Sequence, residues 1–333
     1  MSSFLQRLPK AELHLHLEGT VEPATLVELS KRHDAVPLTI GQVEEIYRYT
    51  DFLGFLMAFK AVTERLTTPE DFEYITYELM RTLKQQNVLH AEVYVSVGVV
   101  QWRGEQFEPL FEGMERGRER GQHDFGVSLL WIFDAVRHFG TDAAKLVFDL
   151  AAEYRDRNVV GIGIGGDEKR AGAEMYKDLY AEAKSRGLRL TAHAGESVGA
   201  ESIWAALNIG AERIGHGLTA HHDRELIEVL AQRQIPIEIC FSSNLRTACC
   251  PHPHSHPVRR YFEEGLMVTI NSDDPAMFQT TLLNEYIRVQ QHFEFSDEQM
   301  LELARNSFEA SFLPYEKKAE YLQMFDAVAA QTR

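Results

Sequence analysis

Two histidines, His14 and His16, close a short apolar segment near the start of the chain. If Ala11–Leu17 is a β-strand, side chains two residues apart point to the same face. Two imidazoles on one face can bind a single zinc ion. Two incidental histidines are the alternative interpretation of this spacing. Because unpaired imidazoles are costly to bury in an apolar strand, we interpret the pair as metal ligands.

Further groups of the right chemistry follow other apolar segments. His193 and Glu196 share the sequence His-Ala-Gly-Glu, and a hydrolytic zinc site needs a carboxyl group for proton transfer. His216 lies between two glycines that leave room for a ligand. Asp273 and Asp274 precede a proline, and Asp273 would complete a site of three histidines and one aspartate. Hydrogen-bonded core histidines and a solvated turn remain the alternatives.

Eight strand candidates supply the elements that must position these residues. Most are rich in Val, Ile and Leu without polar alternation, as expected for strands that are buried on both faces. They are Ala11–Leu17, Val88–Val97, Phe125–Phe133, Val159–Gly163, Leu188–His193, Arg213–His216, Ile235–Cys240 and Met267–Asn271. Helical patterns lie between them, at Pro69–Gln86, Asp142–Arg155, Ala171–Arg186, Asp223–Gln232 and Val258–Glu264.

This alternation predicts an α/β protein with a (β/α)8 TIM barrel, and an open doubly wound sheet is the alternative. The long interval after the first strand predicts extra helices, one of them at Asp51–Phe59. In such a barrel, active residues lie at the C-terminal ends of the strands. The candidate histidines and carboxylates all follow strand candidates, so we expect them to meet at one end of the barrel.

Composition narrows the function classes. The 333 residues are 44% hydrophobic and 25% charged, which is typical of a globular protein with a buried core. We expect one domain over residues 1–333, which the motifs above predict to be a metal-dependent hydrolase. A net charge of −16 disfavours nucleic acid and anionic membranes as partners. Three cysteines without a paired motif fit a reducing compartment. Without a signal-peptide core or a membrane-spanning run, we expect a cytoplasmic protein, and the oligomeric state stays open.

Three other patterns carry rival interpretations. Gly161–Gly166 matches G-x-G-x-x-G, which keeps a nucleotide-binding Rossmann module open, although Asp167 and Glu168 follow where a pyrophosphate would bind. The histidine- and proline-rich tract at 251–257 predicts a surface loop with no α-helix. An apolar stripe at helical spacing is either core or a lid over a pocket; it comprises Phe52, Phe55, Leu56 and Phe59.

Taken in order, these motifs resemble the adenosine deaminase family of amidohydrolase-type barrels. The segments that carry the resemblance are Pro9–Gly19, Gly165–Glu168, His193–Glu196, Arg213–Gly217 and Ser272–Pro275. They span nearly the whole chain. The resemblance implies hydrolytic deamination at C6 of a purine, with one zinc ion per chain. A binuclear relative would carry a bridging lysine on a central strand, and Val159–Gly166 contains none.

The resemblance also implies a role for each matching residue. The zinc ligands would be His14, His16, His193 and Asp273. Glu196 would protonate purine N1, His216 would orient the zinc-held water and help to deprotonate it, and Asp274 would bind purine N7. Further substrate contacts would come from His16, Glu18, the Gly166 N–H, and a hydrophobic gate of Phe52, Phe55, Leu56 and Phe59.

Two departures from the family pattern concern the sugar side of the substrate. Position 18 is Glu, where adenosine-specific members commonly carry Asp and adenine-acting members carry Glu. Adenine-acting members, however, tend to have Asp in place of Gly215 and to lack a Gly-Asp-Glu segment. The segment Ser242–Cys250 lacks the usual Thr-Gly ending. The implied function is therefore a 6-aminopurine nucleoside deaminase, nominally for adenosine, with aminodeoxyfutalosine (an adenosine-like menaquinone precursor) and adenine as alternative substrates.

Overall fold

The computed structural model describes residues 3–330, apart from the side chains of residues 3, 52 and 53. Eight parallel strands pair in chain order from β1 to β8. Their bounds are β1 Lys10–His16, β2 Val88–Val95, β3 Ser128–Val136, β4 Val159–Gly165, β5 Arg189–Ala194, β6 Arg213–His216, β7 Ile237–Ile239 and β8 Val268–Ile270. Almost every strand position is buried, because the barrel interior and the surrounding helices cover both faces.

The ring closes between β1 and the segment that follows β8. Leu15 forms a parallel bridge with Asp273. The His16 N–H donates to the Asp273 carbonyl at 2.9 Å, and the Asp273 N–H donates to the His14 carbonyl at 3.0 Å. This closure confirms the predicted (β/α)8 barrel and excludes the open doubly wound sheet. The Rossmann alternative is wrong because Gly161 and Gly163 lie inside β4, where a side chain would collide with the neighbouring strands.

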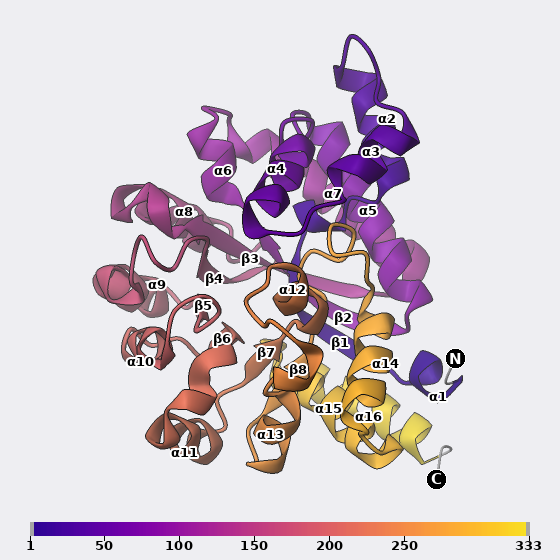
Figure 1. Cartoon of the computed structure of the whole chain (residues 1–333). Helices are drawn as coiled ribbons and strands as arrows, with labels where there is room; N and C mark the ends of the chain where they lie inside the picture. Colours follow the sequence, from indigo (N-terminus) through magenta and orange to yellow (C-terminus); the bar gives the residue numbers. More distant parts are fainter. Residues whose placement is uncertain (1–2, 331–333) are drawn as a thin grey trace.

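Helices surround the strands on all sides (Figure 1). Before β2 they are α1 Ser3–Arg7, α2 Pro23–His33, α3 Ile40–Ile46, α4 Phe52–Thr63 and α5 Pro69–Gln85. From β2 to β5 they are α6 Val97–Trp102, α7 Phe107–Phe125, α8 Thr141–Glu153 and α9 Lys177–Ser185. After β5 they are α10 Ala200–Asn208, α11 Arg224–Arg233, α12 Phe241–Arg246, α13 Val258–Glu263, α14 Leu282–Phe293, α15 Asp297–Glu309 and α16 Tyr315–Ala329. None of the helices within residues 3–330 has the length and apolar character to cross a lipid bilayer.

The predicted insertion after the first strand is present as α2, α3 and α4, which precede α5. These three helices gather on one side of the barrel (Figure 1). The barrel helix α5 begins with a capping box of Thr68 and Asp71, and Pro69 stands in its first turn. Glycines let α7 pack closely on α5, since a Cβ at Gly113 would lie 2.0 Å from the Pro69 carbonyl oxygen.

Two sequence predictions of elements need correction. The strand predicted from Phe125 is wrong at its start, because Phe125 ends α7 and Gly126 caps that helix in the left-handed region at φ +69°. The helix predicted over Ala171–Arg186 begins instead as a 3-10 turn at Ala173–Tyr176 and becomes α-helical only over α9. The helix predicted at Asp51–Phe59 continues to Thr63 as α4, and the other predicted helices agree with the observed ones within two residues.

Candidate active site and metal centre

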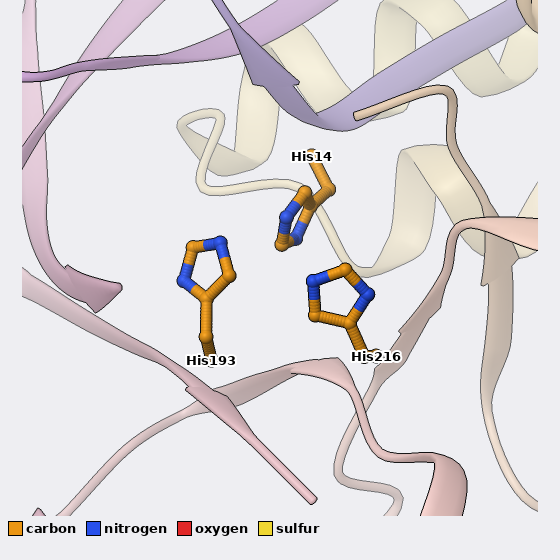
Figure 2. Close-up of side chains that lie close together, drawn as sticks. All are labelled: His14, His193 and His216. Carbon is orange, nitrogen blue, oxygen red and sulfur yellow. The ribbon is translucent and has the colours of Figure 1, made fainter. Parts of the chain in front are cut away.

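The C-terminal ends of four barrel segments bring the predicted site residues together. β1 supplies His14 and His16, β5 supplies His193, β6 supplies His216, and the segment after β8 supplies Asp273. Figure 2 shows the rings of His14, His193 and His216 turned toward one another, and a ring nitrogen of each lies within 4.8 Å of the others. The strand-end prediction is therefore correct for the positions of these residues.

The atoms that face each other form a cage for a cation. His16 Nε2 lies 3.2 Å from His193 Nε2 and 3.4 Å from Asp273 Oδ1. His14 Nε2 is buried, has no hydrogen-bond partner within residues 3–330, and lies 3.6 Å from the same Asp273 oxygen. Three imidazoles and one carboxylate are a donor set that zinc prefers. The buried, unpartnered Nε2 of His14 is the observation that best fits a metal at this position.

Hydrogen bonds on the outer side of the cage fix the position of the Nδ1 proton in His14 and His193. The His14 Nδ1–H donates to Glu238 Oε2 at 2.8 Å, and the His193 Nδ1–H donates to the Ile164 carbonyl at 3.1 Å. A metal-binding histidine commonly donates its second ring nitrogen in this way. In both rings Nε2 therefore faces the cage, and its lone pair would be available to a metal whenever the ring is neutral.

The electrostatics of the cage also favour a cation. Burial lowers the pKa of His16 to about 4 and that of His193 well below its usual value, so both rings are neutral, as metal ligands must be. Burial alone would lower the pKa of His14, but the carboxylates of Asp273 and Glu238 raise it to about 10. Burial would likewise raise the pKa of Asp273, yet His14 holds it well below the usual range. Without a metal, a proton on His14 supplies the positive charge that these carboxylates require.

Glu196 lies at the edge of the cage on a loop that a second carboxylate shapes. Glu168 accepts the backbone N–H groups of Gly195, Glu196 and Ser197 at 2.8 to 3.0 Å, together with the Ser202 hydroxyl. These contacts give a structural role to Glu168, one of the two acidic residues that follow β4. Glu196 Oε2 lies 3.8 Å from His216 Nε2, and burial raises the pKa of the Glu196 carboxyl.

Asp274 stands beside the cage with its carboxyl buried. Its Oδ1 atom has no hydrogen-bond partner among the described residues. Burial, followed by the charge of Asp273, raises the pKa of Asp274 well above its usual value, which favours the protonated form of this carboxyl. Gly19 is needed here, because a Cβ at that position would lie 2.0 Å from Asp274 Oδ1.

A cavity of about 600 Å³ leads from this cluster to the surface. Its inner wall includes His16, His193, Glu196 and the exposed backbone of Gly166 at φ +88°. Phe55, Leu56 and Phe59 of α4 line its mouth, and Phe55 stacks on Phe278 with ring centroids 5.1 Å apart. The side chain of Phe52, the fourth residue of the predicted gate, lies outside the described residues.

Glu18 is buried beside this cavity but is not among its lining residues. Its Oε1 atom accepts the Ser96 N–H at 3.0 Å, and its Oε2 atom has no partner among the described residues. Burial raises the pKa of Glu18 to about 7. Ser96, which does line the cavity, therefore stands between Glu18 and a ligand on the sugar side.

Sequence analysis missed several residues of the site. Glu238 and Asp134 lie inside apolar strands, where a charged residue needs a partner or a function, and that signal was present in the sequence. Asp134 lines the cavity with an unpartnered Oδ1 atom, and burial raises its pKa to about 7. Asn244 donates its amide to His216, and no sequence pattern marks that contact.

The histidine- and proline-rich tract differs in part from its prediction. As expected it holds no α-helix, only the 3-10 turn η5 Pro253–Ser255, and His252 and His254 are exposed. The prediction of a surface loop is wrong for His256, which is buried and bonds to Asn244 at 3.1 Å. The prolines prevent an α-helix in this segment, but they do not determine the burial of His256, which contacts Asn244 of α12.

Comparison with known proteins agrees with the barrel and its site. The sequence model of the adenosine deaminase family matches residues 9–328. The chain is 36% identical to aminodeoxyfutalosine deaminase of Streptomyces avermitilis, over 99% of this chain and 94% of that protein. The structure resembles an adenine deaminase from Arthrobacter aurescens, with a TM-score of 0.88 and 31% identity over 98% of this chain and 99% of that one.

It also resembles an amidohydrolase from Burkholderia ambifaria that was solved with bound zinc, with a TM-score of 0.89 and 26% identity over 99% of this chain and 93% of that one. The match of the family model over nearly all of the chain, together with these relatives, identifies the activity at the level of the reaction. The chain belongs to the adenosine deaminase family and is a hydrolase that deaminates adenine-like compounds.

Proposed function

We propose that this protein is a zinc-dependent deaminase of 6-aminopurine nucleosides, with conversion of adenosine and water to inosine and ammonia as its simplest reaction. The observation that carries the proposal is the position of the buried Glu196 carboxyl, whose pKa burial raises, 3.8 Å from His216 Nε2 and beside a cage of three histidines and one aspartate that borders the cavity. An acid next to a metal site is the arrangement that hydrolysis of a C–N bond requires.

The zinc ion would be held by His14, His16, His193 and Asp273, whose facing atoms lie 3.2 to 3.6 Å apart. A bound zinc lowers the pKa of a water molecule to about 7, which makes a hydroxide nucleophile available at neutral pH.

The carboxyl groups of the chain activate and orient the purine. Burial raises the pKa of Glu196, which favours the protonated acid that would donate to N1 and make C6 electrophilic. N7 is a hydrogen-bond acceptor, so it needs a donor, and the protonated Asp274 supplies one. Gly166 is exposed and lines the cavity, and its backbone N–H would bind N3. Release of ammonia from C6 leaves a 6-oxopurine.

The size of the cavity favours a nucleoside over a free base. At about 600 Å³ it falls within the range of sites that hold drug-sized ligands and exceeds what one purine needs. The space continues outward past Ser96 and Val99 to Phe139. We expect the sugar to occupy this outer part, next to Ser96.

The outer wall supports aminodeoxyfutalosine as a second candidate substrate. This compound extends an adenosine-like nucleoside by an aromatic carboxylic acid. Trp102 is 71% exposed at the cavity mouth and stacks on Phe139 with ring centroids 6.0 Å apart. Lys60 and Arg103 line the same mouth. Aromatic and cationic side chains together are suited to an aryl carboxylate.

A substrate panel tests the proposal. Purified, zinc-loaded enzyme is assayed for ammonia release with adenosine, deoxyadenosine, adenine and aminodeoxyfutalosine. We expect the nucleosides, aminodeoxyfutalosine included, to exceed adenine in kcat/KM by about tenfold or more, because the sugar adds binding energy remote from the reacting carbon. Glu196→Gln should lose turnover and keep its zinc, whereas Glu201→Gln, at an exposed position of α10, should match the wild type. Adenine as the best substrate would contradict the proposal, as would the absence of stoichiometric zinc.

A further inference from the structure

A line of buried hydrogen bonds runs from the histidine- and proline-rich tract to the candidate active site. The Val258 N–H donates to His256 Nδ1 at 3.2 Å. His256 Nε2 lies 3.1 Å from Asn244 Oδ1, and Asn244 Nδ2 lies 3.0 Å from His216 Nδ1. His256, Asn244 and His216 are 4%, 0% and 2% exposed, so water does not compete for these contacts.

The direction of every bond in this line follows from its first donor. A backbone N–H can only donate, so His256 Nδ1 accepts and carries no proton. Burial lowers the pKa of His256 to about 3, so the ring is neutral and its single proton sits on Nε2. That N–H donates to the amide oxygen of Asn244, which turns the amide NH2 group toward His216.

The same reasoning extends to the catalytic side of His216. An amide NH2 can only donate, so His216 Nδ1 is the acceptor of the Asn244 bond. In the neutral ring the proton must then sit on Nε2. This atom faces Glu196 at 3.8 Å and Asp273 at 4.0 Å. A hydrogen-bond donor, and not a lone pair, therefore points into the site.

His216 thus differs from the two histidines nearest to it. His14 and His193 each donate their Nδ1–H to an oxygen atom, which leaves a lone pair on Nε2 for a metal. A ring nitrogen of His216 lies within 4.8 Å of ring nitrogens of both, so distance alone does not separate the three rings as ligands. The group bonded to Nδ1 distinguishes the rings. Asn244 donates to Nδ1 of His216, whereas the oxygens of Glu238 and Ile164 accept from Nδ1–H of His14 and His193.

We propose that Asn244 and His256 are positioning residues that hold His216 as the Nε2–H tautomer. This tautomer keeps His216 out of the metal ligand set and makes it a donor toward the oxygen nucleophile, so a neutral His216 takes no proton from that oxygen. The proposal rests on the proposed deaminase function for its catalytic consequence. The tautomer itself is a property of the chain that holds whichever purine is the substrate.

The test is the nitrogen-15 NMR spectrum of histidine-labelled, zinc-loaded enzyme, with His216→Ala used for assignment. In the wild type we expect the His216 Nδ1 signal of an unprotonated nitrogen and the Nε2 signal of a protonated one. Asn244→Asp replaces the donating NH2 with an acceptor, so it should move the proton to Nδ1. His256→Leu leaves the Asn244 amide free to rotate and should give a mixture of both forms.

Activity supplies a second readout. Asn244→Asp should lower kcat about 100-fold or more, in the range by which a misplaced acid or base group slows an enzyme, with a smaller effect on KM. His256→Gln keeps a side-chain N–H donor for Asn244 and should restore most of the kcat that His256→Leu loses. His254→Ala, at an exposed position of the same tract, is the matched control and should behave as the wild type.

Three results would overturn the proposal. They are a wild-type His216 protonated at Nδ1, an Asn244→Asp variant that keeps the Nε2–H signal, and a loss of kcat in the variants without a change of tautomer. If Asn244→Asp does not fold, the His256→Leu and His256→Gln pair makes the same comparison. If no 6-aminopurine is deaminated, the proposed function fails while the spectrum still decides the tautomer.

Discussion

The buried carboxylate of Glu238 contacts both His14 and Arg213, and a Gln at this position would keep the shape of the side chain while removing its charge. Its Oε2 atom accepts the His14 Nδ1–H at 2.8 Å, and its Oε1 atom lies 2.6 Å from Arg213 Nε. Both residues and Glu238 are at most 1% exposed. Glu238→Gln keeps an oxygen that can accept from His14 but removes the negative charge. We predict two measurable losses, one in metal affinity and one in stability.

The predicted loss of metal affinity follows from the hydrogen bond that Glu238 accepts from His14, a proposed zinc ligand. A carboxylate that accepts from a metal-binding imidazole raises the basicity of the ring, and loss of such a partner typically weakens metal binding about 10–100-fold. That factor corresponds to about 1.4–2.7 kcal/mol. We therefore expect the zinc dissociation constant of Glu238→Gln to rise by this factor.

The loss of stability follows from the buried guanidinium of Arg213. Arg213 has two carboxylate partners, Glu92 and Glu238, and it stacks over the Phe312 ring at 3.8 Å. Removing one partner of a buried ion pair costs about 3–5 kcal/mol. Because Glu92 remains, we expect the free energy of unfolding of the metal-free protein to fall by about 3 kcal/mol, at the low end of that range.

Competition with a zinc-binding dye and urea unfolding of the metal-free protein measure the two losses. Glu212→Gln is the matched control, since its ion pair with Arg189 at 2.7 Å is solvent-exposed and should contribute less than about 1 kcal/mol. An unchanged zinc dissociation constant in Glu238→Gln would refute the idea that Glu238 supports His14 as a ligand. An unchanged unfolding midpoint would refute the ion-pair argument.

Three further predictions test other parts of the site. Removal of the metal by a chelator should abolish ammonia release and lower Tm, and added zinc should restore both, because the metal binds the folded chain alone; activity that survives chelation would contradict a metal centre. Glu168→Ala leaves the N–H groups of Gly195, Glu196 and Ser197 without their acceptor, so kcat should fall more than KM changes and stability should drop by about 1–3 kcal/mol, as measured by steady-state kinetics and urea unfolding. Burial alone would raise the pKa of Glu92, but Arg213 lowers it to about 2, so its contribution to stability is present above pH 4.5 and is lost as the pH falls toward 2; Glu92→Gln should therefore flatten the stability profile in this window, and an unchanged acid slope would contradict the assignment.

Strand ends were the part of the site that the sequence predicted best. A closed barrel of parallel strands places all strand C-termini at one end, so residues that follow apolar segments must meet there. That rule located His14, His193, His216 and Asp273 without any knowledge of their partners. It works because the barrel topology, and not local packing, determines the neighbourhood of these residues.

Residues behind the site could not be located by that rule. The partner of His14 is Glu238, 224 positions along the chain, and the partner of His216 is Asn244 within the short helix α12. Such pairs depend on side-chain packing between elements. One signal was nevertheless available: Glu92, Asp134, Arg213 and Glu238 are charged residues inside apolar strands, and charges are rarely buried without a partner.

His256 shows why composition misleads for irregular segments. The prolines correctly predict that residues 251–257 form no α-helix, but the absence of a helix does not imply that the side chains are exposed to solvent. The tract instead folds back so that the Cys250 N–H donates to the Asn244 carbonyl at 2.8 Å, next to the His256 contact with the Asn244 side chain. Burial in such a loop follows from satisfied polar groups, which the composition of the segment does not encode.

The backbone at two site residues connects the fold to the chemistry. His216 and Asp273 both have φ +64°, a left-handed conformation that costs a residue with a side chain about 1 kcal/mol or more. Asp273 is held in it by two backbone hydrogen bonds to β1, those of His16 N–H to Asp273 O and of Asp273 N–H to His14 O. The bonds that close the barrel are therefore the same bonds that turn the Asp273 carboxylate toward the His14 and His16 nitrogens. Barrel closure and assembly of the cage are one structural event, which explains why strain persists at Asp273 although glycine would relieve it.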